Sequence, residues 1–472
     1  MNPSVTTYLL TLLDLTRQPV FLVGGSVRDL LLGREPIKDI DIVMPAGSES
    51  VARQFSDRIG GSFFFLDEER KITRVTILHD HEIIQFDFTN FEGDDLLADL
   101  GRRDFTINAM AVDAREFIAT EALDNLIDPH GGKSDVAARL VRATRPGVLD
   151  EDPLRLLRAV RFAATLGFSI ETATAEHIRG RVKRLAEPAP ERIREELFII
   201  LSEPGADRHL LLLESLGLLS VLCPELDLLR GFAPGRYHVH DVLTHSIKTA
   251  GYVDRVLEQV MRLSPDRADA LRAHLGEQME HAVPRIAALR FACLLHDMAK
   301  PETFTNEDGR IRFHGHDNLG AEKALRLCRR FRLSRNTETI VSRVIKHHMR
   351  LFNLSAPGGP SKNAMYRYCR DLGDAVPESL LLSQADALAT YEIMPREKFM
   401  DTEKPMAAVL EYYYGKFLKA EARPLVTGSD LIRRGMQPGP RFRDILDDIK
   451  ERQAAGVLNS RDEALDYLAH LK

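Results

Sequence analysis

Two aspartates, Asp39 and Asp41, have the spacing of ligands for a divalent cation. Residues two positions apart on a β-strand point to the same face of the sheet. An apolar strand from Val20 to Val23 comes before them and runs into a Gly24-Gly25 turn. Glycines let backbone amides approach a phosphate at the start of the next helix. Hard oxygen ligands beside such a turn indicate metal-assisted chemistry on a phosphate compound.

The short helix after the turn has Ser26 as its expected N-cap and Arg28 in its first turn. A lone Gly-Gly turn is usually just a turn, and D-x-D alone is more often structural. Together, G-G-x-V-R-D and the later D-x-D resemble the active-site opening of class II tRNA nucleotidyltransferases (CCA-adding enzymes) and the related bacterial poly(A) polymerases. The resemblance implies that Asp39 and Asp41 are catalytic and bind Mg²⁺, and that Gly24, Gly25 and Arg28 hold a triphosphate.

The bulk composition describes a soluble globular protein of two to four domains, with 472 residues, 44% hydrophobic and 28% charged. A net charge of −6 means that nucleic acid must be held by a local basic patch. The four scattered cysteines have no metal-type spacing and favour a reducing cytosol, so we expect them to be core residues. No signal peptide or membrane span is evident, so we expect a cytoplasmic protein without a membrane partner.

The first segment, residues 1–140, is predicted to be an α+β head with one small mixed sheet. A helix is expected at 50–60, followed by strands at 62–66, 74–78 and 83–88. The resemblance implies a polymerase-β-like nucleotidyltransferase fold with a third catalytic acid, for which Asp87 is the candidate. A structural strand-end aspartate is the alternative, because the family commonly has an arginine where this chain has Phe91-Glu92.

A second motif, R-R-D-F-T-I-N-A-M, starts at Arg102. Two adjacent arginines can simply be a solvated face, but this run matches the family's second motif. The resemblance places Arg102, Arg103, Asp104 and Asn108 near the triphosphate and ribose. Guanidinium groups pair with phosphate, and a carboxylate accepts from ribose hydroxyls. The run D-P-H-G-G at 128–132 matches the family's hinge and is expected to be structural.

The second segment, residues 141–222, is predicted to be a helical neck whose long helix runs through EDPLRLLRAVRFAATLGF from Glu151. An arginine stripe on a surface helix is the bland interpretation. The resemblance implies a template in which Asp152 accepts from an exocyclic amine and Arg155 donates to the adjacent ring nitrogen. Cytosine and adenine both present that pair, whereas uracil and guanine do not. Arg158 is a further nucleotide-binding candidate on the same helix.

A basic cluster in the neck suits a phosphate backbone, although a solvated helix face looks similar. Its proposed RNA-binding members are Arg179, Arg181, Lys183 and Arg184. The helix beginning at Pro190 resembles the family motif that braces the base-reading helix, so we expect it to give support only.

The third segment, residues 223–400, is rich in histidine. Its order H…H-D…D resembles the HD superfamily of metal-dependent phosphohydrolases. The resemblance implies that His245, His296, Asp297 and Asp386 bind a divalent metal, with His316 and His347 as candidate extra ligands. Imidazole and carboxylate suit several transition metals and Mg²⁺, so the sequence does not identify the ion.

The final segment, residues 401–472, resembles the C-terminal region of HD-bearing CCA-type enzymes and is predicted to be a helical RNA-holding or packing tail. The resemblance, which covers nearly the whole chain, implies an enzyme that adds CCA to the tRNA 3′ end from CTP and ATP, releasing pyrophosphate, with a second, phosphohydrolase activity in the HD domain. A CC-only or A-only tRNA nucleotidyltransferase and a poly(A) polymerase remain alternatives. An HD phosphohydrolase with a nucleotide-binding head is an alternative of another class, and a non-catalytic sensor is a weaker one. The oligomeric state stays open.

Overall fold

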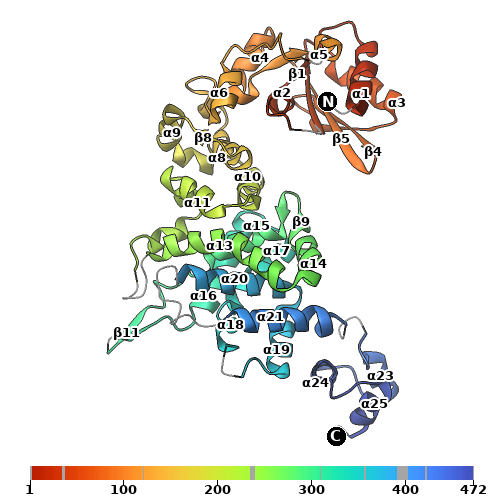
Figure 1. Ribbon diagram of the computed structural model, residues 1–472, viewed down its shortest axis with the longest axis vertical. Helices are drawn as coiled ribbons and strands as arrows, with labels where there is room; N and C mark the ends of the chain where they lie inside the picture. The colour runs from red at the N-terminus through yellow and green to blue at the C-terminus, as the bar shows by residue number, and fades with distance from the viewer. Residues whose placement is uncertain are drawn as a thin grey trace. The chain divides into compact units, whose positions relative to one another are not determined.

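The computed structural model describes residues 3–34, 38–120, 122–233, 240–308, 310–355, 358–390, 402–419 and 423–470. Two compact units divide the chain (Figure 1). The first comprises Met1–Pro188 and Leu216–Leu218, and the second comprises Ala189–Ser215 and Leu219–Lys472. The four predicted segments are smaller than these units, and that division stays a prediction. Its boundary at 400–401 lies outside the described residues.

The first unit is built on a six-stranded sheet with the order β3-β4-β5-β2-β1-β6. β2 and β5 are parallel, and the other neighbouring pairs are antiparallel, so the predicted mixed sheet and α+β class are confirmed. Its helices and strands are α1 Pro3–Leu15, β1 Phe21–Val23, α2 Gly24–Leu31, β2 Asp39–Met44, α3 Ser48–Ile59, β3 Ser62–Asp67, β4 Ile72–His79, β5 Glu82–Asn90, α4 Leu96–Arg102, β6 Ala111–Asp113, α5 Ala114–Thr120, α6 Gly132–Ala138, β7 Leu140–Val141, α7 Val148–Glu151, α8 Arg155–Leu166, β8 Ser169–Ile170 and α9 Thr172–Arg179.

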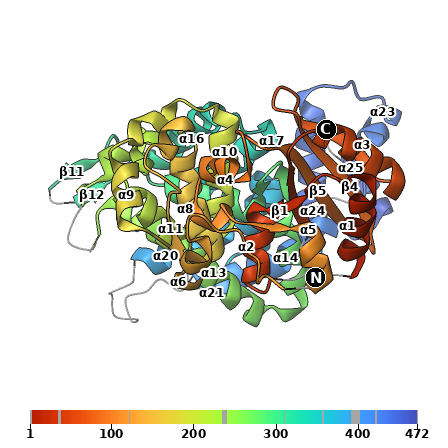
Figure 2. The same cartoon turned by 90° about the horizontal axis from the view of Figure 1, so that it is seen from above.

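The two faces of this sheet differ because side chains alternate along each strand. Helix α3 packs on β4 and β5, and α1 packs on α3 (Figure 2). Phe55 of α3 contacts Phe86 and Phe88 there, with ring centroids 5.0 and 5.7 Å apart. Alternation therefore turns Asp87, between the two phenylalanines, to the opposite face.

The predicted continuous helix from Glu151 is wrong, because the chain breaks between α7 and α8. Asp152 has the extended values φ −140° and ψ 103°. A residue that precedes proline is disfavoured in the helical region, and Pro153 follows here. The break sets Asp152 at the start of α8, and Gly167, with φ +69°, ends that helix.

The second unit is mainly helical, and its longest helix, α13, packs against α15 and α20. Nearly every residue of α20 is buried, so that helix runs through the core. The helices and strands that follow α9 are α10 Pro190–Ser202, α11 Ala206–Ser215, α12 Leu218–Leu222, α13 Val242–Leu263, α14 Pro265–Gly276, β9 Gln278–Glu280, β10 Val283–Pro284, α15 Arg285–Leu295, β11 Thr305–Glu307, β12 Arg310–Arg312, α16 His316–Arg330, α17 Arg335–His347, α18 Arg350–Asn353, α19 Lys362–Leu372, α20 Val376–Thr390, α21 Glu403–Tyr412, α23 Gly428–Arg433, α24 Pro440–Ala455 and α25 Arg461–His470.

The C-terminal helices α23, α24 and α25 share a small hydrophobic cluster that includes Leu431, Ile449 and Leu468. Thr427 and Asp430 form a capping box at the start of α23, so part of the predicted tail motif has a structural role. All four cysteines are buried and unpaired, as expected of core residues. Among the described residues, no helix is both long and apolar enough to cross a membrane.

Candidate functional site

Three carboxylates lie on the sheet face opposite α3. Asp39 and Asp41 come from β2, and Asp87 of β5 lies directly beside Asp41 in the parallel register. Arg74 donates to both carboxylate oxygens of Asp87, from Nε to Oδ1 at 2.6 Å and from Nη2 to Oδ2 at 2.7 Å. Gln85 donates to Asp39 Oδ1 at 3.0 Å. The sequence-predicted catalytic residues are thus neighbours on two adjacent strands.

Electrostatics make this face suited to a cation. Burial raises the pKa of Asp41, and nearby Arg103 offsets the rise only in part. Burial also raises the pKa of Asp39, against the opposing effect of Arg74. Carboxylates whose charged forms are disfavoured in this way gain from a divalent ion, whose hard charge matches oxygen ligands. The residues therefore fit a divalent metal, which the carboxylates of Asp39 and Asp41 would hold.

The glycine turn is fixed against Asp41. Gly24 has φ +65°, and a Cβ there would lie 2.8 Å from Asp41 Oδ2. The amide of Gly25 donates to the same oxygen at 3.0 Å. Only glycine allows this close approach in the left-handed region. The turn thus helps to orient the Asp41 carboxylate.

Ser26 does not cap the helix, so that prediction is wrong. Helix α2 begins at Gly24, and its N-cap is Val23 without a side-chain cap bond. The buried Ser26 hydroxyl instead donates to the carbonyl of Asp39 at 3.1 Å and accepts from the amide of Asp41 at 2.7 Å. Ser26 therefore joins α2 to β2.

A hydrogen-bonded chain connects three motifs that lie far apart in the sequence. Arg28 donates to Asn108 at 2.7 Å, and Asn108 donates to Asp104 at 3.1 Å. Arg158 of α8 contacts Asp104 Oδ2 through two nitrogens, at 2.9 and 2.7 Å. Burial alone would raise the pKa of Asp104, but Arg158 and Asn108 hold it below its usual value. Arg28 also pairs with Asp29 at 3.0 Å.

The two adjacent arginines of the second motif have different surroundings. Arg103 pairs with Asp99 at 3.1 Å, and its Nη1 atom lies beside Gly24. Arg102 contacts Glu92 at 3.4 Å and is 55% exposed. The structure therefore brings Arg103 to the carboxylates and leaves Arg102 on the surface.

The predicted base-reading pair lies at the break between α7 and α8. Asp152 Oδ1 accepts from the amide of Leu154 at 3.1 Å. Arg155 donates to the carbonyl of Val148 at 2.9 Å and lies 3.5 Å from Glu151. These bonds hold both side chains at one turn.

The predicted basic cluster is partly neutralised. Arg181 pairs with Asp150 at 2.6 Å, and Arg184 pairs with Asp150 at 3.2 Å and with Glu187 at 2.9 Å. These bonds lower the pKa of Asp150. The other two members, Arg179 and Lys183, are exposed.

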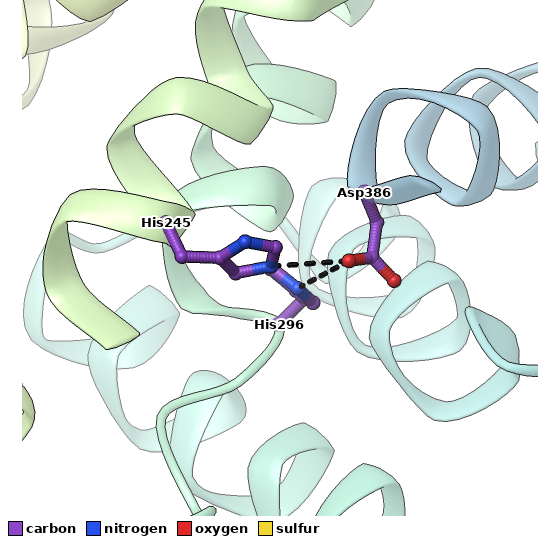
Figure 3. Close-up of side chains that lie close together, drawn as sticks. All are labelled: His245, His296 and Asp386. Atoms are coloured by element: carbon purple, nitrogen blue, oxygen red, sulfur yellow. Dashed lines mark ion pairs between the residues drawn. The ribbon is translucent and has the colours of Figure 1, made fainter. Parts of the chain in front are cut away.

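A second centre lies inside the helical unit. His245 of α13, His296 at the end of α15 and Asp386 of α20 point toward one another (Figure 3). Asp386 Oδ1 lies 3.0 Å from the Nε2 of His245 and 3.8 Å from that of His296. Asp297 Oδ2 lies 3.2 Å from His296 Nε2. The four predicted ligands are therefore together and buried.

Two more histidines extend this centre. His316 Nε2 lies 3.5 Å from Asp297 Oδ1 and 3.2 Å from the Nε2 of His348, which is 1% exposed. His347, the other histidine predicted as an extra ligand, is not in the centre and instead lines a separate pocket of about 370 Å³ on α16 and α17. Lys300 lies 2.5 Å from Asp297 Oδ2. His316 lies at the centre, as its predicted role as an extra ligand requires, and the histidine beside it is His348 rather than the predicted His347.

The donor atoms of the centre are arranged for a metal. The Nδ1 atoms of His296, His316 and His348 each contact a backbone carbonyl three residues earlier, at 2.7 to 2.8 Å. That contact fixes the ring and leaves Nε2 toward the centre. His296 Nε2 and both Asp297 oxygens are buried without a well-formed hydrogen bond. Burial also lowers the pKa of His348 to about 4, so this imidazole is neutral and able to bind a metal. Among the described residues, two groups of three side chains have possible metal-ligand atoms that all lie within 4.8 Å of one another. Both groups belong to this centre.

Sequence comparison matches the chain to three family profiles. Residues 20–142 match the poly A polymerase head domain, residues 167–229 match the probable RNA and SrmB-binding site of polymerase A, and residues 242–391 match the HD domain. The chain is 34% identical to an A-adding tRNA nucleotidyltransferase of Deinococcus radiodurans, with 95% of this chain and 94% of the relative covered. It is 32% identical to a CC-adding tRNA nucleotidyltransferase of Geobacter sulfurreducens, with 95% and 91% covered.

The chain belongs to the tRNA nucleotidyltransferase and poly(A) polymerase family. The predicted family is thereby confirmed, and so is the enzyme class. Among solved structures, a Thermotoga maritima CCA-adding enzyme complexed with tRNA-CCA has a similar fold, with a TM-score of 0.61 and 21% identity, covering 100% of this chain and 97% of that one.

Sequence reasoning missed three side chains of this family member's two centres, Arg74, Lys300 and His348, and it gave Ser26 a capping role that the structure does not show. One signal could have identified His348. The buried positions of α17 are Thr337, Ile340, Val341, Val344 and Ile345, and the same helical spacing reaches 348 rather than 347. The pairing of Arg74 with Asp87 depends on the β4–β5 register, which the sequence alone does not fix.

Proposed function

We propose that the protein transfers nucleotides from CTP and ATP to the 3′ end of tRNA. The observation that carries this proposal is the placement of Asp39, Asp41 and Asp87 beside the Gly24-Gly25 turn, in a chain of this family. The RNA 3′-oxygen forms a bond to the α-phosphorus, the bond to the β-phosphate oxygen breaks, and pyrophosphate leaves. The hydroxyl proton is lost to water.

The product we propose is CCA. Specialisation for C or for A is a second candidate, because relatives that match over nearly the whole chain are named A-adding and CC-adding. Relatives named multifunctional CCA proteins, such as the one of Neisseria gonorrhoeae at 34% identity, cover 70% of the chain.

The test uses tRNA transcripts that end before CCA and after CC, incubated with each nucleotide singly and with CTP and ATP together. Addition of CCA and then a stop supports the main proposal. Addition to only one transcript identifies a specialist, and a long oligo(A) ladder identifies a poly(A) polymerase. No addition to either transcript overturns the proposal.

The catalytic roles follow from the site. Asp39 and Asp41 would hold Mg²⁺, which activates the hydroxyl and stabilises the leaving pyrophosphate when bound. Asp87, oriented by Arg74, adds the third carboxylate. Gly24, Gly25, Arg28 and Arg103 would hold the triphosphate, with the Gly25 amide exchanging its present bond to Asp41 Oδ2 for one to a phosphate oxygen. Arg102 would take part from the rim of the site.

Base selection is assigned to Asp152 and Arg155, with Asn108 and Arg158 beside the nucleotide. The donor and acceptor of this pair match the shared edge of cytosine and adenine and are mismatched against uracil and guanine. For RNA, Arg179 and Lys183 are exposed at the surface, and Arg181 and Arg184 would exchange an acidic partner for a phosphate.

A metal-dependent phosphohydrolase activity is proposed for the HD centre, because two groups of three buried side chains share His296 and hold their donor atoms within 4.8 Å of one another, with His316 beside Asp297 and His348. His245, His296, Asp297 and Asp386 would hold a divalent ion, and His316 and His348 add ligands beside Asp297. Two measurements test this proposal. One is the metal content of the purified protein, and the other is its hydrolysis of generic phosphomonoester and phosphodiester substrates. We further propose that the enzyme acts in the cytoplasm, on the basis of its tRNA-processing relatives.

A further inference from the structure

The sheet face that carries the candidate catalytic carboxylates also exposes large apolar side chains. Phe64 and Leu66 on β3 are 41% and 45% exposed, Leu78 on β4 is 70% exposed, and Ile83 on β5 is 57% exposed. Leu78 and Ile83 lie opposite each other, whereas Phe64 lies opposite Arg74, four residues along β4 from Leu78, so Phe64 and Leu66 form a separate exposed apolar pair. Exposed apolar side chains that lie together on a protein surface often mark an interaction site. Strand β3 is at the edge of the sheet, where exposed apolar side chains favour unwanted association. These exposed side chains therefore indicate a binding surface.

Strand register places Phe64 in line with the catalytic carboxylates. Phe64 lies opposite Arg74, Arg74 lies opposite Asp87, and Asp87 lies opposite Asp41. With neighbouring strands ~4.8 Å apart, Phe64 is about 14 Å from Asp41. These four residues form one row across the strands, with the exposed ring of Phe64 at one end and Asp41, where the new bond is proposed to form, at the other.

Phe64 has no core role that would account for an aromatic residue. Its neighbours Phe63 and Phe65 point to the other face, where the guanidinium of Arg53 in α3 lies 4.2 and 5.5 Å from their rings. Phe64 and Leu66 alternate with them and face solvent. The one cation in the row, Arg74, is already bound to Asp87. Within this row, Phe64 therefore offers a ring for stacking, whereas the charge of Arg74 is already paired.

We propose that Phe64, with Leu66 beside it, is the stacking platform for the unpaired 3′-terminal nucleotides of the acceptor RNA. This inference rests on the proposed function, because transfer requires a 3′-hydroxyl at Asp39 and Asp41. The incoming base is assigned to the α7–α8 turn, so the acceptor strand needs a different surface that reaches the same carboxylates. Aromatic side chains hold unpaired bases of any sequence by stacking, which suits an end whose last base changes after each addition.

The experiment measures RNA binding by fluorescence anisotropy without nucleotide, so that no addition occurs. The probes are an acceptor-stem minihelix with two unpaired 3′ nucleotides and the same minihelix with a blunt end. The variants are Phe64→Ala, Phe64→Tyr and, as a matched control, Leu10→Ala. Leu10 is 49% exposed on α1, which packs on the α3 side of the sheet.

We expect Phe64→Ala to raise the dissociation constant for the overhang minihelix about tenfold, the typical loss for one stacked base. The blunt minihelix should bind the variant as it binds the unchanged protein. Phe64→Tyr keeps a ring and should bind normally, and Leu10→Ala should have no effect. Equal losses on both minihelices, or no loss on either, overturn the platform.

Two further measurements complete the test. Light scattering distinguishes an RNA platform from a contact between copies of the chain, and an addition assay distinguishes failure of the platform from failure of the proposed function. A change in molar mass between the unchanged protein and Phe64→Ala, measured by light scattering, shows that the patch joins two copies of the chain and overturns the inference. Nucleotide addition by the unchanged protein is assayed first. If it extends tRNA while the Phe64 variants bind normally, only the platform is wrong. If it extends no RNA, the proposed function itself fails.

Discussion

Replacing Gly24 by alanine should damage catalysis far more than stability. Gly24 has φ +65°, and an added Cβ would lie 2.8 Å from Asp41 Oδ2 and 3.0 Å from Arg103 Nη1. The left-handed backbone costs an L-residue ~1–2 kcal/mol. To restore an ordinary contact of ~3.4 Å, the Asp41 carboxylate must retreat by about 0.6 Å. Because a misplacement of about 1 Å can cost ~100-fold in rate, we expect a 10- to 100-fold loss.

Alanine substitutions at two other glycines separate the effect of backbone strain from the effect of the close contact with Asp41. Gly33 has φ +64° with nothing within 4 Å of an added Cβ, so Gly33→Ala carries the strain alone. Gly25 has no positive φ, and its added Cβ would lie 3.5 Å from Asp41 Oδ2 and 3.4 Å from Arg28 Nη2. Gly25→Ala therefore tests an ordinary contact at the same carboxylate, with the amide donor kept.

The assay is single-turnover nucleotide addition to tRNA lacking CCA, with a thermal unfolding curve for each variant. Gly24→Ala and Gly33→Ala should lower the midpoint by similar amounts, and only Gly24→Ala should lose the rate of addition. Gly25→Ala should stay within a few-fold of the unchanged protein. A normal rate for Gly24→Ala, or an equal loss of rate for Gly33→Ala, refutes the reasoning.

Three further outcomes are expected. Arg158→Ala should destabilise the first unit by about 2 kcal/mol at pH 7, because it leaves the buried Asp104 charge uncompensated. The folded-state pKa of Asp104 is depressed, so the stability that this carboxylate contributes is fully present above the ordinary Asp pKa of ~3.9 and is lost as pH falls through the folded-state pKa. The thermal unfolding midpoint of Arg158→Ala should therefore depend less on pH in acid than that of the unchanged protein. His348→Ala should lower the bound metal measured by elemental analysis at least ~10-fold at limiting metal, whereas His347→Ala should not. Asp152→Ala should reduce the preference for CTP and ATP over UTP and GTP in single-nucleotide assays; an unchanged preference would place base selection elsewhere.

Local patterns predicted the head well because they depend on neighbours in sequence. Alternation over 62–66, 74–78 and 83–88 identified β3, β4 and β5, and the D-x-D spacing put Asp39 and Asp41 on one face. The glycine turn was predicted to approach a phosphate, yet its observed contact is with Asp41. That contact depends on how α2 meets β2, across 16 positions of sequence.

Long-range side-chain choices could not be predicted in the same way. Arg28 and Asn108 are 80 positions apart, and Arg158 and Asp104 are 54 apart. Nothing in spacing or composition selects these partners over other acids and amides, because each pairing depends on how distant elements pack. The break at Asp152 is different in kind: Pro153 is a local signal, and it outweighed the apolar periodicity that predicted a continuous helix.

Asp104 shows how the structure changes the interpretation of a motif residue. The sequence predicts that its carboxylate accepts from ribose hydroxyls. A carboxylate has about four lone-pair sites on its two oxygens. Here Oδ1 accepts from the amide of Phe105 at 2.8 Å and from Asn108 at 3.1 Å, and Oδ2 accepts from two nitrogens of Arg158. A ribose hydroxyl would have to displace one of these donors at a buried site, which costs a hydrogen bond to a charge. We therefore infer that Asp104 positions Arg158 and Asn108, and that Asp104→Asn should impair nucleotide binding through those two residues rather than through a lost ribose contact. Comparing CTP with its 2′-deoxy analogue tests this: the loss in Asp104→Asn should be the same for both nucleotides, and a loss confined to the ribonucleotide would restore the ribose role.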